Sequence, residues 1–141
     1  MSGVPFHYVD LRTFCYGTED EARVESALDH FLPEEVAIER VASEGHHGDR
    51  IVVLSARVEN ADDVRYVLDR LADIDLGGIR AELEERVDEN CSLFLRLDKQ
   101  AAFSGRVEQG DGLELRAKVE AYPAKKEAAV ENAADALESR A

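Results

Sequence analysis

The chain has 141 residues, 45% of them apolar, which is the size and composition of one folded domain and excludes a wholly disordered protein. No run approaches the roughly 18 consecutive apolar residues of a membrane span, and the first residues carry no secretory signal pattern, so we expect a cytoplasmic protein with no membrane partner. The formal net charge is −14, from 17 basic and 31 acidic residues, with an isoelectric point near 4.6.

Apolar residues recur with a period of two in expected strands and about 3.6 in expected helices. In chain order we expect a strand at 4–16, a helix at 18–33, strands at 35–46 and 50–58, helices at 60–71 and 79–90, strands at 93–97 and 113–121, and a helix after Pro123. Strands joined by short turns pair antiparallel, so the order β-α-β-β-α-α-β-β-α predicts an α+β fold. It has an antiparallel or mixed sheet of about five strands with helices on one face. Because half the strand positions are polar, we expect the other face to be open.

Short-range signals place the boundaries of these elements. Thr18 and Glu21 have the spacing of a capping box for the first helix. Asn60 is placed to cap the second helix. The glycine pair at 77–78 is predicted to break the chain, and the glycine-flanked polar segment 45–49 is predicted to be a hairpin turn.

These elements are expected to form a single domain, because no linker or internal repeat divides them. We assign residues 1–122 to one α+β domain and residues 123–141 to a helix of the same domain. The apolar face of that helix is mostly alanine, which leaves loose docking open. Cys15 and Cys91 are too few for a disulfide framework and have apolar neighbours, so we expect buried thiols.

The surface composition suits a salt-rich cytoplasm, because only four of the 17 basic residues are lysines. Dense carboxylates hold water and cations at a surface, and molar salt screens their repulsion within roughly 3 Å. An ordinary acidic protein is the alternative. If the halophilic interpretation holds, a negative net charge does not exclude a nucleic-acid partner.

The basic residues are unevenly placed along the chain. Residues 91–126 carry seven basic and five acidic side chains, whereas the remainder carries ten basic and 26 acidic ones. All the lysines lie in this window: Lys99, Lys118, Lys125 and Lys126. This concentration favours an anion-binding site, although strand faces and loops also carry lysine by chance.

Motifs of catalysis are absent from the sequence: there is no P-loop, nucleotide-binding glycine motif, nucleophile elbow or zinc-protease helix. Glu44, His46, His47 and Asp49 could form a metal-dependent hydrolase site, but a glycine-flanked polar turn is also what a hairpin requires. Cys91 has no evident orienting partner for nucleophilic chemistry. We therefore expect a protein that is not an enzyme and has no cofactor and no metal site.

The stretch RLDKQAAFSG, from Arg96 to Gly105, combines donors for phosphates and base edges with an aromatic ring. Arg96 and Asp98 share the strand face opposite the leucines, and Phe103 is a candidate for stacking on an unpaired base. Arg116 and Lys118 alternate with apolar residues on the next strand and would extend the same face. The alternative is that Asp98 pairs with a neighbouring basic side chain on an ordinary sheet surface.

Three segments together resemble an archaeal family of predicted RNA-binding, exosome-associated proteins: EGHHGDRIVVL at 44–54, RLDKQAAF at 96–103 and VEAYP at 119–123. The resemblance implies a fold similar to that of the large-subunit ribosomal protein that binds 5S RNA. It also implies RNA binding as an accessory of the RNA-degrading exosome, not as its nuclease. The motif positions that carry over are His46, Gly48, Arg50, Arg96, Asp98, Lys99 and Gln100.

The sequence thus predicts a non-catalytic RNA-binding protein associated with the archaeal exosome. The alternative is a protein–protein adaptor that docks on an exosome or ribosomal partner. The candidate RNA-binding residues are His46, His47, Arg50, Arg96, Lys99, Gln100, Phe103, Arg116, Lys118, Lys125 and Lys126.

Overall fold

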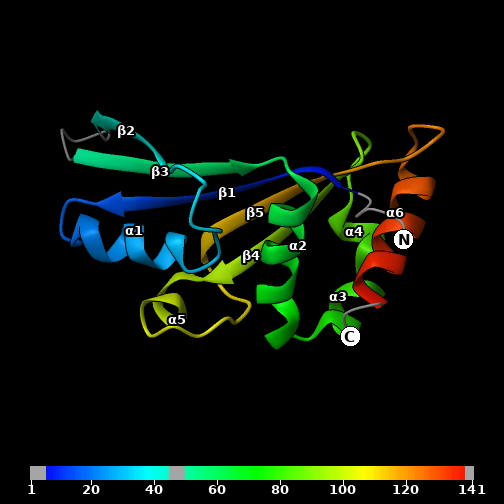
Figure 1. Ribbon diagram of the computed structural model, residues 1–141. Helices are drawn as coiled ribbons and strands as arrows, with labels where there is room; N and C mark the ends of the chain where they lie inside the picture. Colours follow the sequence, from blue (N-terminus) through cyan, green and yellow to red (C-terminus); the bar gives the residue numbers. More distant parts are fainter. Residues whose placement is uncertain (1–5, 45–49, 139–141) are drawn as a thin grey trace.

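A computed structural model describes residues 6–44 and 50–138 and contains one five-stranded antiparallel sheet (Figure 1). The strands are β1 (Phe6–Tyr16), β2 (Glu39–Glu44), β3 (Arg50–Val58), β4 (Ser92–Asp98) and β5 (Gly112–Val119). Their order across the sheet is β2-β3-β1-β5-β4, so the first strand of the chain lies at the centre. The predicted α+β class is confirmed, and β2 with β3 and β4 with β5 pair antiparallel as expected, although a short helix that was not predicted lies between the last two.

Helices cover one side of the sheet, below it in Figure 1. Those in the described residues are α1 (Glu21–Asp29), α2 (Ala61–Arg70), α3 (Leu76–Ala81), α4 (Leu83–Arg86), α5 (Lys99–Phe103) and α6 (Lys126–Glu138), with a 3-10 turn η1 (Leu71–Asp73) after α2. Within this part of the chain, no helix is both long and apolar enough to cross a membrane.

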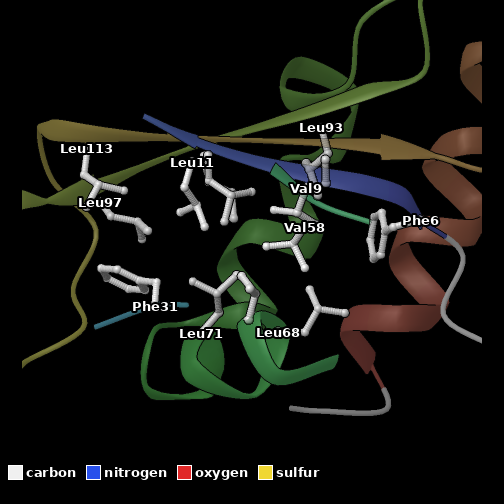
Figure 2. Close-up of a cluster of buried hydrophobic side chains, with 14 of the residues drawn as sticks. Phe6, Val9, Leu11, Phe31, Val58, Leu68, Leu71, Leu93, Leu97 and Leu113 are labelled. Carbon is white, nitrogen blue, oxygen red and sulfur yellow. The ribbon is translucent and has the colours of Figure 1, made fainter. Parts of the chain in front are cut away.

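The core lies between the sheet and the helices. Figure 2 shows Phe31 and Leu71 from the helix layer beneath Leu11, Leu97 and Leu113 of the strands, and all five side chains are fully buried. Burying such a side chain contributes roughly 1.5–3 kcal/mol. A register slip of one residue would expose every leucine of a strand, so the alternating pattern determines which strand face the helices cover.

Two helix caps predicted from the sequence can be checked against the structure. Asn60 caps α2 as predicted, because its side-chain oxygen accepts a hydrogen bond from Asp62 N at 2.8 Å. The predicted capping box at Thr18 is wrong. Helix α1 is capped by Asp20, whose carboxylate accepts a hydrogen bond from Ala22 N at 3.0 Å.

The predicted break at Gly77 and Gly78 is also wrong, because both residues lie inside α3. Asp75 caps this helix by accepting a hydrogen bond from Gly78 N at 2.9 Å. A Cβ on Gly78 would lie 2.5 Å from the Asp75 carboxylate. The glycine therefore serves a close approach, not a chain break. The third predicted helix divides into α3 and α4, after which Val87 forms a bridge with Leu93.

Helix α6 is firmly packed, although the sequence left loose docking open. Ala129 and Ala133 are fully buried and Leu137 is nearly so. The helix contacts α3, α4 and β5. Asn132 Nδ2 also donates a hydrogen bond to Glu120 O at 2.7 Å. Small alanine side chains bring this helix close to its neighbours, so a weakly apolar sequence still contributes to the common core.

Candidate nucleic-acid interface

The sheet surface opposite the helices is uncovered, and we call it the open face. It consists of the outward side chains of β1 (Tyr8, Asp10, Arg12, Phe14 and Tyr16) and the side chains paired beside them on the other strands. Directly paired residues of an antiparallel sheet lie on the same face. The strand register therefore arranges these side chains in rows across the sheet.

The central row joins Arg57, Asp10 and Arg116 from three adjacent strands. Asp10 Oδ1 accepts a hydrogen bond from Arg57 Nε at 2.7 Å, and Asp10 Oδ2 accepts from Arg116 Nη2 at 2.8 Å. Burial alone would raise the pKa of Asp10, but the two guanidinium groups outweigh it and hold the pKa below its usual value. Asp10 is therefore ionised at neutral pH. Its one negative charge fixes two positive ones, which leaves an excess of positive charge at the centre of the face.

A second row contains Arg12, Glu114 and Arg96. Arg12 Nη2 lies 2.6 Å from Glu114 Oε2. Arg96 instead forms a 3.5 Å ion pair with Asp111, and its side chain is 72% exposed. Exposed ion pairs of this kind contribute little stability, so both arginines can exchange partners at low cost.

Aromatic rings flank these arginines. The rings of Phe14 and Tyr16 are nearly parallel, at 23°, with centroids 6.5 Å apart, and Tyr16 is 51% exposed. The Arg57 guanidinium lies 3.9 Å from the ring centroid of Tyr8. Phe94, paired with Arg116 in register, is 44% exposed. Guanidinium groups and unstacked aromatic rings are the groups that contact phosphates and unpaired bases.

The charge of the open face differs from that of the whole chain, in which acidic residues greatly outnumber basic ones. Its paired strand residues include five basic side chains and four acidic ones: Arg12, Arg57, Arg96, Arg116, Lys118, Asp10, Glu39, Asp98 and Glu114. Asp10, Arg57 and Arg116 also line a depression of about 1180 Å³. Glu35, Glu59 and Asp63 also line this depression, so its carboxylates outnumber its arginines, and the excess of positive charge is confined to the paired strand residues.

The structure corrects the prediction that Lys99 contacts phosphate. This side chain is buried, and its Nζ donates hydrogen bonds to Phe14 O and to Glu19 Oε1, both at 2.8 Å. Burial would raise the pKa of Glu19, but Lys99 and the backbone N–H of Tyr16 outweigh it and lower the pKa. Lys99 is therefore a structural cation that ties the start of α5 to the end of β1.

The residues after Lys99 also lie away from the open face. Asp98 caps α5 by accepting a hydrogen bond from Ala101 N at 2.9 Å. The run that follows is therefore helical and packs against α1. Gln100 is exposed on this helix, whereas Phe103 is partly buried against the core with the Arg23 guanidinium 5.0 Å from its ring centroid.

The remaining predicted residues are scattered. Arg116 and Lys118 lie on the open face, where Lys118 Nζ donates a hydrogen bond to Asn90 O. Arg50 shares its strand face with the core residues of β3 and so lies on the helix side. The lysines at 125–126 stand at the start of α6, at the end of the sheet where β1 begins (Figure 1). His46 and His47 lie outside the described residues.

The described residues offer no metal centre. Nowhere in 6–44 and 50–138 do three or more His, Cys, Asp or Glu side chains gather as a possible ligand set. The suggested hydrolase cluster includes Glu44, but its other members fall in the segment 45–49, outside the described residues. Cys15 and Cys91 are buried free thiols, as predicted, and burial raises the pKa of Cys15.

The fold and the open face together define the class of protein: an α+β protein with an antiparallel sheet covered by helices on one side and exposing arginine and aromatic side chains on the other. A family model described as RNA binding matches residues 8–119. The chain belongs to this RNA-binding family.

Relatives of the chain come from archaea. It is 34% identical to RNA-binding protein PAB1135 of Pyrococcus abyssi over 94% of both chains. It is also similar to the solved structure of a DUF54 protein from Methanothermobacter thermautotrophicus, with a TM-score of 0.81 and 43% identity over 94% of this chain and 98% of that one. A DUF54 protein from Sulfolobus solfataricus, 18% identical over 95% of this chain and 99% of that one, shares the fold with a TM-score of 0.70.

Proposed function

We propose that this protein binds RNA through the open face and has no catalytic role of its own. The observation that carries the proposal is the central row, in which Asp10 holds Arg57 and Arg116 side by side. Arg57 donates from Nε and Nη2 to the two Asp10 oxygens, but a guanidinium carries five N–H donors, and the remaining ones can contact phosphate oxygens. Family membership and the name of the Pyrococcus relative support RNA as the anion.

The acidic remainder of the surface supports this assignment. Carboxylates repel RNA wherever basic side chains do not offset their charge. RNA contact is therefore confined to the face on which the charges are balanced. Arg96, Arg12 and Lys118 extend the positive groups to either side of the central row. Predicted contacts at Arg50, Gln100 and 125–126 would require RNA to pass around the sheet edge, and we do not include them in the proposed interface.

The proposal is tested with the variant Arg57→Gln/Arg116→Gln. We expect RNA affinity to fall at least about tenfold, equivalent to about 1.4 kcal/mol, because two phosphate contacts are lost. The slope of log affinity against log salt should also become shallower, by roughly 0.7 for each contact on a single strand. The measurement is fluorescence anisotropy of labelled single-stranded and hairpin RNAs in KCl, with folding checked by circular dichroism.

A matched control removes the same charge from the helix side. Arg65→Gln/Arg80→Gln alters two arginines of α2 and α3 that pair with Asp62 and Glu138. We expect this variant to keep the wild-type affinity. Equal weakening by both double variants would mean that binding follows total charge, and it would remove the open face as the site.

The exosome accessory role implied by the sequence resemblance is part of this proposal. Its test is retention of exosome subunits by the tagged protein from archaeal extract, with and without nuclease. Loss of the subunits after nuclease treatment would indicate association through RNA. If the subunits are retained neither with nor without nuclease, the exosome part of the proposal is wrong. RNA binding itself is tested separately, by anisotropy.

A second candidate function, the protein–protein adaptor, is favoured by the edge of β2. The opposite edge strand, β4, is partly covered by the bridges Val87–Leu93 and Leu97–Gln109. In contrast, every residue of β2 is exposed, and Val41 is 59% exposed. An extended partner segment can add a strand to such an edge. If β2 is the docking site, Val41→Lys will abolish the partner retention that survives nuclease treatment.

A further inference from the structure

We propose that the RNA bound by the open face is single-stranded, with unpaired bases stacked on the rings of Phe14 and Tyr16. This inference rests on the proposed function and names its substrate class. The two residues are successive outward positions of β1, and their nearly parallel rings lie 6.5 Å apart. They form a continuous aromatic surface at one end of the open face.

The surroundings of these rings suit a nucleobase. In register, Phe14 pairs with Val53, which pairs with Val41, so apolar side chains continue the surface across three strands. The Arg12 guanidinium lies 5.4 Å from the ring centroid of Phe14. A flat base gains from apolar and aromatic contact, whereas a phosphate loses hydration there without compensation.

The arginines lie next to this aromatic surface along the same strand. Moving along β1 from Tyr16, the outward positions are Phe14, Arg12 and then Asp10 with its two bound guanidiniums. An RNA strand running along β1 would therefore place bases at one end and phosphates at the centre. Tyr8 lies beyond them, and its ring is covered by Arg57, so we assign it to positioning that guanidinium and not to base stacking.

Duplex RNA cannot use this arrangement. The faces of its bases are covered by their stacked neighbours, and proteins that bind it contact phosphates and 2′-hydroxyls across the minor groove. Duplex would therefore engage only the arginines and would lay charged backbone on the apolar surface formed by Val41, Val53 and Phe14. The open face should discriminate in favour of unpaired bases.

The test compares labelled single-stranded RNA with blunt duplex RNA of the same length and sequence. We expect the single strand to bind at least about fivefold more tightly, because stacking on even one aromatic side chain has effects of this size. The variant Phe14→Leu/Tyr16→Leu, which keeps apolar side chains, should abolish that preference. Its salt dependence should match that of the wild type, because no charge is removed.

Two further variants make the result decisive. Tyr16→Leu alone alters a half-exposed ring outside the core and serves if the double variant does not fold. Tyr122→Leu removes a ring that is 86% exposed but lies outside the open face, and it should leave binding unchanged. Equal binding of single strand and duplex, or wild-type affinity of Phe14→Leu/Tyr16→Leu, would overturn this inference but not the proposed function. Binding of neither RNA by the folded protein would overturn both.

Discussion

Lys99 is the residue whose predicted role differs most from its position in the structure. Lys99 belongs to the run RLDKQAAF that suggested a phosphate site, yet its ammonium group bonds Glu19 and a backbone oxygen inside the molecule. Arg96, only three positions earlier, is 72% exposed on the open face, in an exposed ion pair with Asp111. The short motif therefore contains both a buried structural residue and an exposed residue, and only their burial in the folded protein distinguishes the two.

Replacing this lysine should reduce stability, and it also removes the ammonium group that bonds Phe14 O and lies 5.3 Å from the ring centroid of Tyr16. In Lys99→Met the Glu19 carboxylate and Phe14 O lose their donor, and breaking a largely buried pair costs roughly 3 kcal/mol. We expect the urea midpoint to fall accordingly, and the salt dependence of RNA binding by the folded protein to match that of the wild type, because the buried lysine makes no phosphate contact. Lys125→Met, which alters an exposed lysine, is the control and should leave the midpoint in place. Wild-type stability of Lys99→Met together with weakened RNA binding would return Lys99 to the interface.

Strand β1 illustrates which features of an element can be predicted from the sequence and which cannot. Its described part, Phe6–Tyr16, lies within the predicted strand 4–16, and Tyr8, Asp10 and Arg12 visibly alternate with core residues. The alternation does not reveal that β3 and β5 flank this strand, because strand order depends on long-range packing. Only that order brings Arg57 and Arg116 to the same carboxylate. The sequence therefore singled out Arg116 as a candidate from its own strand, but it did not single out Arg57 or Asp10, which the strand order places beside it.

The junction between β4 and α5 was missed for a local reason. The leucine alternation predicted a strand, and the helix that begins at Lys99 is too short for a periodic signal. Its start depends on the Asp98 cap and on the approach of β5 at Gly112. The backbone of Gly112 has φ of 104°, and a Cβ there would lie 2.7 Å from Lys99 Cβ. The position requires glycine for both reasons.

Gly112→Ala should therefore destabilise the protein more than the same change at Gly105. Gly105 also has a positive φ, 75°, but a Cβ there would meet nothing within 4 Å. Gly105→Ala should cost about 1 kcal/mol from backbone strain alone. Gly112→Ala adds a steric clash against the buried Lys99, which we expect to cost at least about 1 kcal/mol more. Urea unfolding of the two variants side by side measures the difference, and equal costs would show that β5 and α5 separate easily.

At the scale of the whole molecule, charge is divided between surfaces. The chain carries a net charge of −14, while the paired residues of the open face are close to balanced. Such a distribution serves two requirements at once. It keeps the protein highly charged in solution, and under the proposed function the open face is the surface that accepts the polyanion.

This distribution leads to a prediction for salt. If the acidic surface is an adaptation to a salt-rich cytoplasm, as we propose, repulsion among carboxylates destabilises the fold at low ionic strength and is screened at molar salt. Raising KCl from roughly 0.2 to 2 M should then increase the melting temperature by about 5 °C or more. Stacking on Phe14 and Tyr16 is not screened, so RNA binding should persist across this range although its electrostatic part declines. Differential scanning calorimetry measures the melting temperature, and anisotropy on the same samples measures RNA affinity. A melting temperature that does not change with KCl would indicate an ordinary acidic protein that is not adapted to salt.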